Sequence, residues 1–350
     1  MTVYSASEAI WPALERTYSY LFRRFKWETF LQLATVATIS EGFVVSFRFS
    51  VPNAFPLDVN TAALKSFLLA PSLLPVTILG AIAIFLIGVY CVFLVTRIRF
   101  GFIHCLIHQS RDLRTASNLY RDEAERFFSA SMLVWLAFLV LIVLAFVAFF
   151  VAGYVVIASP TPEGKLYPGN FLILFFPCIG IAFALILAVC AAQVVLNDFI
   201  LPHMAIEGAT FSRAWAEVRA RIAANRETFL SFFILRLAMP LIAGLILGFI
   251  AWVLGLIVFG ILGISAAGFS AMLDGTTGVR ATLLTAIEWL FVPLALGAGL
   301  VIAVSFGGPL GGFMRSYALF FYGGHYKALG NLLSPPAPQS VAIERIAELP

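Results

Sequence analysis

Long uninterrupted apolar runs constrain this chain more than any other feature of its sequence. An α-helix rises 1.5 Å per residue, so about 20 apolar residues suffice to cross a hydrocarbon core of about 30 Å. We place six such runs, at residues 27–47, 74–95, 132–156, 171–196, 229–263 and 283–306. The sequence therefore predicts an all-α, polytopic helical membrane protein with about six transmembrane helices.

The composition favours the same class. Charged residues make up 11% of the chain, less than half of the roughly 25% that soluble domains carry. The runs lack the apolar–polar alternation of transmembrane β-barrels. The spacing of the four cysteines is typical neither of a disulfide framework nor of a thiolate metal site. The net charge of +4 is spread thinly, so we expect no nucleic-acid partner.

The distribution of basic residues predicts the orientation. With a cytoplasmic N-terminus, 17 of the 22 basic residues fall inside, Arg236 falls within a span, and four fall outside, namely Arg48, Lys65, Lys165 and Arg280. This asymmetry follows the positive-inside rule. The fifth run exceeds a bilayer, so it must tilt, kink at Pro240 or project. Splitting it would give seven spans and place Arg315 and Lys327 outside, so we prefer six spans with both termini cytoplasmic.

The segments between and beyond the spans have their own character. We predict a cytoplasmic amphipathic helix at 1–26 and a transmembrane domain at 27–306, with basic cytoplasmic loops at 96–131 and 197–228. The sequence GGPLGG, at Gly307–Gly312, is expected to end the sixth span and to redirect the chain. It lacks the Lys-Ser or Lys-Thr of a phosphate loop. A cytoplasmic interfacial segment at 307–333 and a Pro-rich cytoplasmic tail at 334–350 would follow.

Two cytoplasmic segments carry apolar side chains at helical spacing, which predicts interfacial amphipathic helices. The stripes consist of Trp11, Leu14, Tyr18, Leu21 and Phe25, and of Phe211, Trp215, Val218 and Ile222.

A short motif recurs along the chain. The sequence ETFL occurs at Glu28 and Glu227, with a looser ERFF at Glu125. Two interpretations remain open. The chain contains three helix-plus-hairpin repeats in one orientation, or the matches arise by chance in a biased composition. A glutamate at a helix start is also ordinary dipole chemistry.

Four stretches carry a resemblance to a known family. They are RTYSYLFRRFKWETFLQLA, TRIRFGFIHCLIHQSRDLR, LPHMAIEGATFSRAW and GGPLGGFMRSYALFFYG. They resemble an uncharacterised family of bacterial six-span membrane proteins, distantly similar to the membrane domain attached to some glycerophosphodiester phosphodiesterases. The resemblance implies a multi-pass cytoplasmic-membrane protein, with no established activity and no catalytic residues. The phosphodiesterase barrel is absent, because no stretch here supplies its strands.

Three charged residues within the apolar runs are candidates for function, because ionisable groups inside a membrane are costly. Glu41 and Glu288 fall at similar depths, in the outer halves of the first and sixth spans, where two acids could form a proton or cation site. They could equally be unrelated. Arg236 lies about 10 Å from the cytoplasmic end of the fifth span at 1.5 Å per residue. It could equally snorkel to the headgroups, or be neutralised by Asp198 or Glu28.

Two further patterns suggest specific roles but also have simpler structural interpretations. His104 and His108 lie four residues apart on one helix face, as zinc ligands do, and His203 and His325 could join them. Two ligands do not make a site, so interfacial histidines are the simpler interpretation, and we predict no metal and no cofactor. Gly244 and Gly248 form a small-residue motif that packs helices within or between chains, although glycine is common in membrane helices.

No catalytic constellation stands out, so we expect no enzyme, although intramembrane active sites leave little trace in a single sequence. The first hypothesis is a non-catalytic scaffold or accessory subunit, with partner membrane proteins or further copies of the chain in the lipid bilayer. The alternative is a transporter or lipid-handling permease that uses Glu41, Glu288 and Arg236. An intramembrane enzyme is the third.

Overall fold

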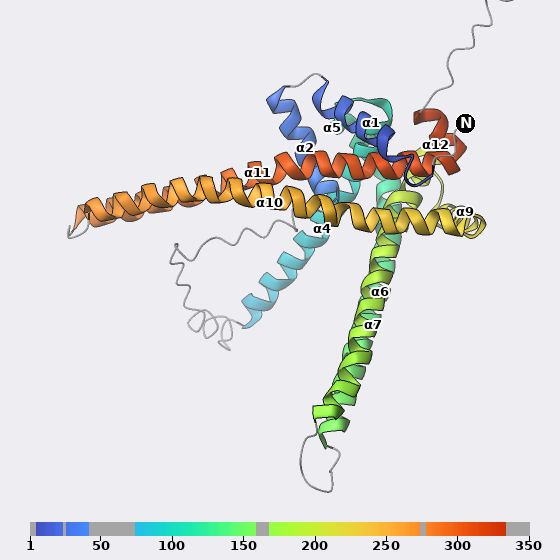
Figure 1. Cartoon of the computed structure of the whole chain (residues 1–350), viewed down its shortest axis with the longest axis horizontal. Helices are drawn as coiled ribbons and strands as arrows, with labels where there is room; N and C mark the ends of the chain where they lie inside the picture. The colour runs from blue at the N-terminus through green and yellow to red at the C-terminus, as the bar shows by residue number, and fades with distance from the viewer. Residues whose placement is uncertain (1–4, 24–25, 42–73, 159–167, 274–277, 334–350) are drawn as a thin grey trace, which may run out of the picture. The chain divides into compact units, whose positions relative to one another are not determined.

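Every regular element among the described residues is a helix, which confirms the all-α prediction for this part of the chain. The computed structural model describes residues 5–23, 26–41, 74–158, 168–273 and 278–333 (Figure 1). The elements are α1 (Ile10–Phe22), α2 (Trp27–Glu41), α4 (Leu74–His108), α5 (Leu113–Leu119), α6 (Arg121–Ala158), α7 (Pro168–Val194), the π-helix η2 (Val195–Ile200), α8 (Leu201–Glu207), α9 (Phe211–Ala224), α10 (Arg226–Leu273), α11 (Val279–His325) and α12 (Lys327–Leu333).

The chain divides into two compact units. Unit 1 comprises Met1–Val3, Tyr120–Phe233 and Phe321–Pro350, and unit 2 comprises Tyr4–Leu119 and Ile234–Phe320. Unit 1 therefore contains α6 to α9 and α12, whereas unit 2 contains α1, α2, α4 and α5. Helices α10 and α11 each contribute one part to each unit.

Five stretches of the described helices are long and apolar enough to cross a membrane. They are Pro75–His108, Arg121–Tyr154, Phe176–Glu207, Arg226–Val258 and Leu296–His325. They correspond to the second to sixth predicted spans, and their apolar character fits a lipid bilayer. The first predicted span overlaps α2, which has 15 residues and ends at Glu41. Its residues 42–47 lie outside the described residues.

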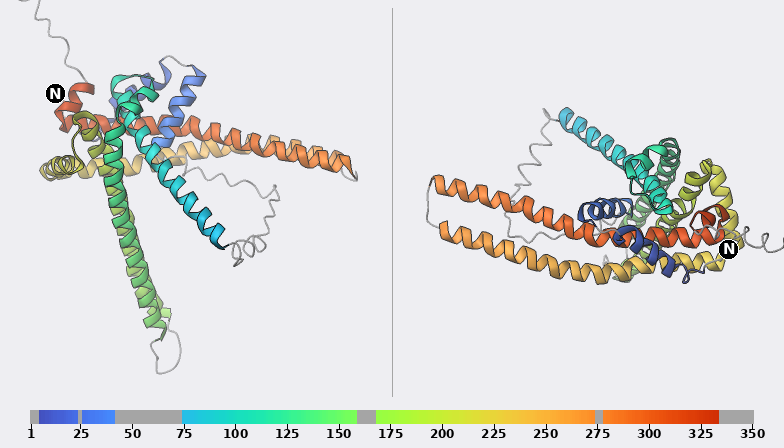
Figure 2. Two further views of the ribbon diagram at one scale, coloured as in Figure 1. Left: turned by 180° about the vertical axis from the view of Figure 1, so that it is seen from behind. Right: turned by 90° about the horizontal axis from the view of Figure 1, so that it is seen from above.

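The fifth apolar run forms one continuous helix. Helix α10 has 48 residues and includes Pro240, so no break divides the run into two helices. At 1.5 Å per residue it measures about 72 Å, more than twice the thickness of a hydrocarbon core. It must therefore tilt or extend beyond that core. Figures 1 and 2 show α11 running alongside α10.

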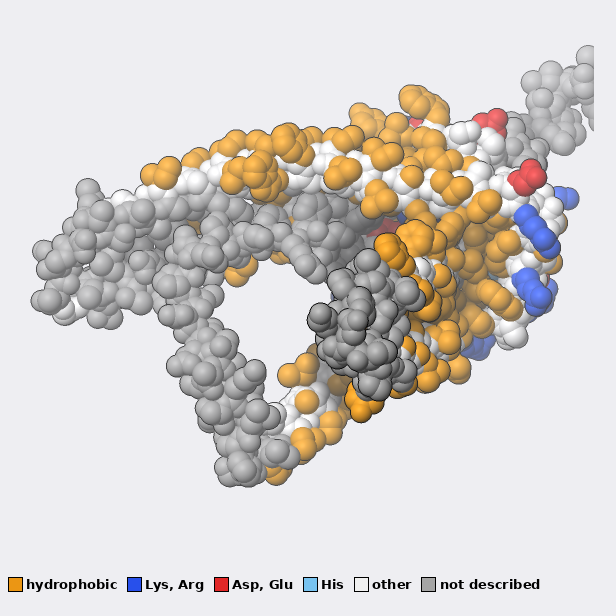
Figure 3. Space-filling view, turned by 60° about the horizontal axis from the view of Figure 1, so that its bottom comes forward, with side chains coloured by type: hydrophobic (Ala, Val, Ile, Leu, Met, Phe, Trp, Pro, Cys, Tyr) orange, Lys and Arg blue, Asp and Glu red, His pale blue; other side chains and the backbone are white. Residues whose placement is uncertain are grey.

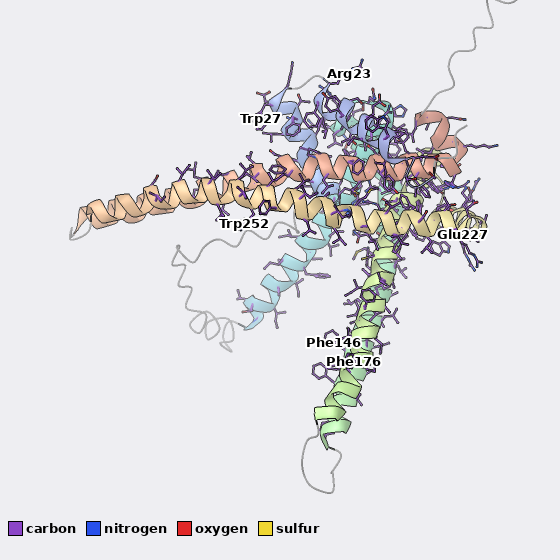
Figure 4. All side chains as sticks on the ribbon, viewed as in Figure 1. Arg23, Trp27, Phe146, Phe176, Glu227 and Trp252 are labelled. Atoms are coloured by element: carbon purple, nitrogen blue, oxygen red, sulfur yellow. The ribbon has the colours of Figure 1, made fainter. Side chains whose placement is uncertain are left out.

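Apolar side chains cover the long helices on their outside. Helices α6 and α7 contact each other and run as two adjacent helices in Figure 1. Phe146 and Phe176, labelled in Figure 4, project outward from it and are 60% and 66% exposed. In Figure 3 hydrophobic side chains cover most of the coloured surface. Apolar surface on this scale is unfavourable in water, so hydrocarbon is the environment that matches it.

The predicted redirection of the chain at Gly307–Gly312 is wrong, because α11 continues through these residues to His325. The glycines allow α2 to lie directly on α11. A Cβ atom on Gly308 would collide with Ala34, and one on Gly311 would lie 2.7 Å from the Ala37 carbonyl oxygen. The segment therefore serves as a helix-packing surface, and it introduces no turn.

Helix α1 contacts both α11 and α4 in unit 2. The Thr17 hydroxyl lies 3.2 Å from the Ser316 hydroxyl of α11 and also donates to the Ala13 carbonyl oxygen. Arg16 donates from Nε to the Leu106 carbonyl oxygen over 3.1 Å. Its guanidinium thereby satisfies a carbonyl in the last turn of α4, where basic side chains are favoured.

Unit 1 is organised around an aromatic core. Phe321 is fully buried and stacks on Phe232, with ring centroids 4.1 Å apart and planes inclined by 14°. Phe199, from the π-helix η2, contacts both rings. Helix α8 ends at Glu207 and is capped by Gly208, which adopts φ 61° and donates its N–H to the Met204 carbonyl oxygen. This left-handed cap, which glycine adopts without strain, leads the chain into α9.

The two predicted amphipathic segments are helical, but only some residues of each apolar stripe are buried. In α1, Trp11 is 73% exposed, whereas Leu21 is buried. In α9, Val218 is buried and Trp215 is 46% exposed. Each stripe is thus split between the interior of its unit and the outside. Phe25 lies outside the described residues.

Candidate functional site

A buried charged cluster lies where α2 ends, within unit 2. Glu41 is the last residue of α2, and its Oε2 lies 2.9 Å from Nη2 of Arg236 on α10. Its other oxygen, Oε1, lies 2.5 Å from Nη2 of Arg315 on α11. One carboxylate therefore joins two arginines that come from different helices and are far apart in the sequence.

A third arginine completes this arginine cluster, which we define as Arg99, Arg236 and Arg315 around Glu41. Arg99, on α4, donates from Nε to the Ser40 carbonyl oxygen over 2.7 Å. Ser40 belongs to the last turn of α2, where carbonyl groups lack helical partners and the helix dipole is negative. Four helices thus contribute to one polar centre.

The cluster is largely shielded from solvent. The side chains of Glu41, Arg236 and Arg315 are 6%, 11% and 2% exposed. Taking charges out of water costs several kcal/mol per ion, and only close ionic contacts offset that cost. Removing one partner from such a cluster leaves the others buried with less compensation, which makes each member a sensitive target for mutation.

The structure brings together two of the three charged residues that the sequence singled out. Glu41 and Arg236 form an ion pair. Glu288 belongs to α11, but its side chain lies outside the described residues, so its predicted pairing with Glu41 stays a prediction. The sequence placed Glu41 in an outer half-span and Arg315 in a cytoplasmic segment. Because the two side chains are in contact, they lie at the same depth, and the two predicted depths are incompatible with each other.

The predicted histidine pair lies together on α4. The rings of His104 and His108 lie 4.4 Å apart between centroids. Within the described residues, the set of three convergent ligand side chains lies elsewhere and consists of His203, Glu207 and Glu217. Of the two histidines expected to join the pair, His203 belongs to that set, and His325 packs its ring against Phe321.

The predicted glycine motif on α10 faces open space. A Cβ atom added to Gly244 or Gly248 meets no described atom within 4 Å. Close packing by glycine is found on α11 instead, at Gly307–Gly312. Contacts of Gly244 and Gly248 with another chain stay a prediction.

Sequence reasoning missed Arg99 and Arg315 as members of the cluster. Both were counted only as cytoplasmic basic residues near the end of a span. A basic residue at that position looks the same whether it faces lipid headgroups or an internal carboxylate. The one available signal was Glu41 itself, because an acid within an apolar run requires a cationic or hydrogen-bonding partner.

Comparison with known proteins identifies a family. A family model described as a family of unknown function, DUF7544, matches residues 4–332. No curated protein and no solved structure matches the chain. The match confirms that the chain belongs to an uncharacterised family, and it shows no link to glycerophosphodiester phosphodiesterases.

Proposed function

The chain belongs to this family of unknown function, so its activity must be inferred from its own residues, and we propose a lipid- or solute-handling membrane protein. In this proposal the arginine cluster binds an anionic group, either a phosphate or a carboxylate. The proposal contains no catalytic step. It places the protein in the cytoplasmic membrane of a bacterium, with both termini on the basic, cytoplasmic side.

Three guanidinium groups at the end of α2 carry the proposal: Arg236 and Arg315 contact the Glu41 carboxylate, and Arg99 donates to the Ser40 carbonyl oxygen. Each guanidinium has five N–H donors in a planar fork that matches carboxylate and phosphate oxygens. Arg99, Arg236 and Arg315 can therefore hold Glu41 and a second anion together. Charged side chains inside membrane proteins commonly mark substrate and ion pathways. Glu41 then acts as an internal competitor for the incoming anion.

A second candidate is the non-catalytic scaffold or accessory subunit. The packing of α2 on α11 favours it, because the backbone contacts at Gly308 and Gly311 leave no room for added atoms. In that case the Glu41 ion pairs serve only to fasten α2 to α10 and α11. A partner subunit would then supply the activity, and loss of an arginine would affect stability alone.

The order of helices supports the proposed threefold repeat. Helix α5 precedes the α6–α7 pair, α9 precedes the α10–α11 pair, and α1 precedes α2 and α4. Each set begins with a short helix of 7 to 14 residues. Glu28 and Glu227 each lie in the first turn of the helix that follows, where the helix dipole favours an acid.

Binding of a defined anion by the purified full chain tests the function. Inorganic phosphate forms one arm, and phosphatidylglycerol in neutral mixed micelles forms the other. We expect saturable binding that weakens at least tenfold in Arg236→Gln. The matched control is Arg219→Gln, which removes the same charge from an exposed position of α9.

The two arms distinguish the sources of the anion. Binding in both arms indicates that a free anion suffices, whereas binding of phosphatidylglycerol alone indicates a lipid headgroup. If neither probe binds saturably, or if both variants lose binding equally, the anion site is refuted. Copurification with a second chain in fixed stoichiometry would then favour the accessory subunit.

A further inference from the structure

A second polar cluster lies in unit 1, on two short helices. His203 and Glu207 are four residues apart on α8, and Glu217 and Arg221 are four residues apart on α9. This spacing places each pair on one helix face. The αL cap at Gly208 links the two helices, so that α9 turns its pair toward α8.

Three of these side chains lie close enough together to bind one metal ion. One ring nitrogen of His203 and one carboxylate oxygen each of Glu207 and Glu217 all lie within 4.8 Å of one another. Two carboxylates this close repel each other unless a proton or a cation lies between them. The arrangement therefore favours a positively charged occupant.

The histidine supplies an independent indication of a ligand. His203 is fully buried, and its Nδ1 has no hydrogen-bond partner among the described residues. The nearest anionic oxygen, Oε2 of Glu217, is 4.0 Å away, which is too long for a hydrogen bond. A buried polar atom without a partner costs about 1–3 kcal/mol and usually indicates a bound ion or water.

A tyrosine orients one of the carboxylates. The hydroxyl of Tyr326 donates to Oε1 of Glu207 over 2.5 Å. Outer partners of this kind fix the orientation of carboxylate and imidazole ligands in metal sites.

We propose that His203, Glu207 and Glu217 bind a divalent transition-metal ion through one imidazole nitrogen and two carboxylates. Imidazole suits Zn²⁺ and carboxylate oxygen is a regular zinc ligand, so Zn²⁺ is the first ion to test. Three protein ligands leave a fourth position for water or another donor. The site is separate from the arginine cluster and does not depend on the function proposed for it.

Arg221 competes with this ion. Its Nη1 lies 2.5 Å from Nε2 of His203 and 3.1 Å from the Tyr322 hydroxyl, and its Nη2 lies 3.3 Å from Oε2 of Glu217. A guanidinium can only donate, so Nε2 of His203 accepts and the ring proton lies on Nδ1.

Metal binding at Nδ1 requires this arrangement to change. The ring proton leaves Nδ1 and a proton enters at Nε2, so the imidazole stays neutral and no net proton is released by the ring. Nε2 then becomes a donor, and Arg221 must withdraw from it. The Arg221 side chain is 27% exposed, so it has room to move outward while it keeps Glu217 as a partner.

Competition gives the proposal a specific signature. Arg221→Gln removes the internal cation and is expected to bind Zn²⁺ at least tenfold more tightly than the parent chain. Glu217→Gln and Glu207→Gln each remove one anionic ligand and are expected to weaken binding at least tenfold. Both glutamates are partly or fully exposed, so these variants test the site without emptying the core as a change at His203 would.

The measurement is equilibrium dialysis of the purified, chelator-treated full chain against Zn²⁺, with metal counted by mass spectrometry. Glu227→Gln is the matched control, because Glu227 is an exposed acid in the first turn of α10, labelled in Figure 4. The double variant His104→Ala/His108→Ala tests the other histidine pair. We expect one Zn²⁺ per chain, unaffected by either control.

Three results would overturn the proposal. The first is that neither the parent chain nor Arg221→Gln binds stoichiometric Zn²⁺. The second is that Glu207→Gln and Glu217→Gln bind Zn²⁺ as tightly as the parent. The third is that the His104/His108 variant alone abolishes binding.

Discussion

Glu41 and Arg315 form a buried ion pair, with Oε1 and Nη2 2.5 Å apart, at the point where α2 ends against α11. The pair ties the N-terminal part of unit 2 to a helix near the end of the chain. Because Arg236 holds the other oxygen of the same carboxylate, Glu41 is shared between two cations. Its removal affects both at once.

Glu41→Gln is expected to destabilise the protein by about 3–5 kcal/mol, the usual cost of removing one partner of a buried ion pair. Glutamine keeps the shape of the side chain but leaves two buried arginines without their anion. The loss is measured by titrating the purified protein in mixed micelles with sodium dodecyl sulfate. Glu28→Gln, at an exposed position of α2, is the control and should change little.

Added anion separates the two candidate functions in this variant. If the cluster binds anions, phosphate or phosphatidylglycerol should restore stability to Glu41→Gln, because the added group replaces the lost carboxylate. If the cluster is only a fastening between helices, the variant should stay equally unstable with and without the added anion.

Gly308→Ala is expected to destabilise unit 2 by about 1–3 kcal/mol, the range for overpacking a filled interior. The added Cβ would collide with the backbone and side chain of Ala34 on α2. At Gly244 the same change meets open space, so Gly244→Ala should be neutral or slightly stabilising, since alanine favours helix by about 1 kcal/mol. Thermal unfolding monitored by size-exclusion chromatography compares the two, and equal effects would contradict the packing role of Gly308.

The spans could be predicted from the sequence because length and apolarity are local properties. The run at 132–156 is an example: helix α6 contains all of it, although the helix already begins at Arg121, within the segment predicted as a loop. The end of α11 could not be predicted in this way. Gly307–Gly312 was predicted to redirect the chain, whereas these glycines continue the helix and helix α2 packs on them.

In the candidate sites, too, some residues could be recognised from their own sequence segment and others only from their contacts in the fold. Glu41 and Arg236 were found because a charge in an apolar run is conspicuous by itself. Arg315 was counted only as a cytoplasmic basic residue, and Glu217 lies in a segment rich in charged residues. Only the fold brings them to their partners. The spacing of His203 and Glu207 was present in the sequence, but two ligands on one helix indicate a site only when a third arrives from another helix.

Phe321→Ala is expected to cost about 3–5 kcal/mol, as do other truncations of buried phenylalanines. Phe321 is fully buried, stacks on Phe232 and meets Phe229 edge-on with centroids 5.4 Å apart, so its loss opens a cavity in unit 1. Phe249→Ala is the control, because Phe249 is 64% exposed on α10. Titration with sodium dodecyl sulfate measures both. Similar losses would show that the aromatic core contributes no more than a lipid-facing ring.

Tyr326→Phe is expected to change how stability depends on alkaline pH. Burial and the hydrogen bond to Glu207 raise the pKa of Tyr326 above its ordinary value of about 10. A raised pKa stabilises the protein fully below the unfolded value and progressively less as the pH rises toward the folded value. The parent chain should therefore be more stable than Tyr326→Phe at pH 8, by about 1 kcal/mol for the hydrogen bond. The difference should shrink toward pH 11, because only in the parent chain does keeping this phenol protonated cost free energy.

Tyr18→Phe, at a 65% exposed position, controls for general alkaline effects. A difference that stays constant from pH 8 to pH 11 would mean that Tyr326 ionises as an ordinary exposed tyrosine does, and that its hydroxyl does not hold Glu207 in place.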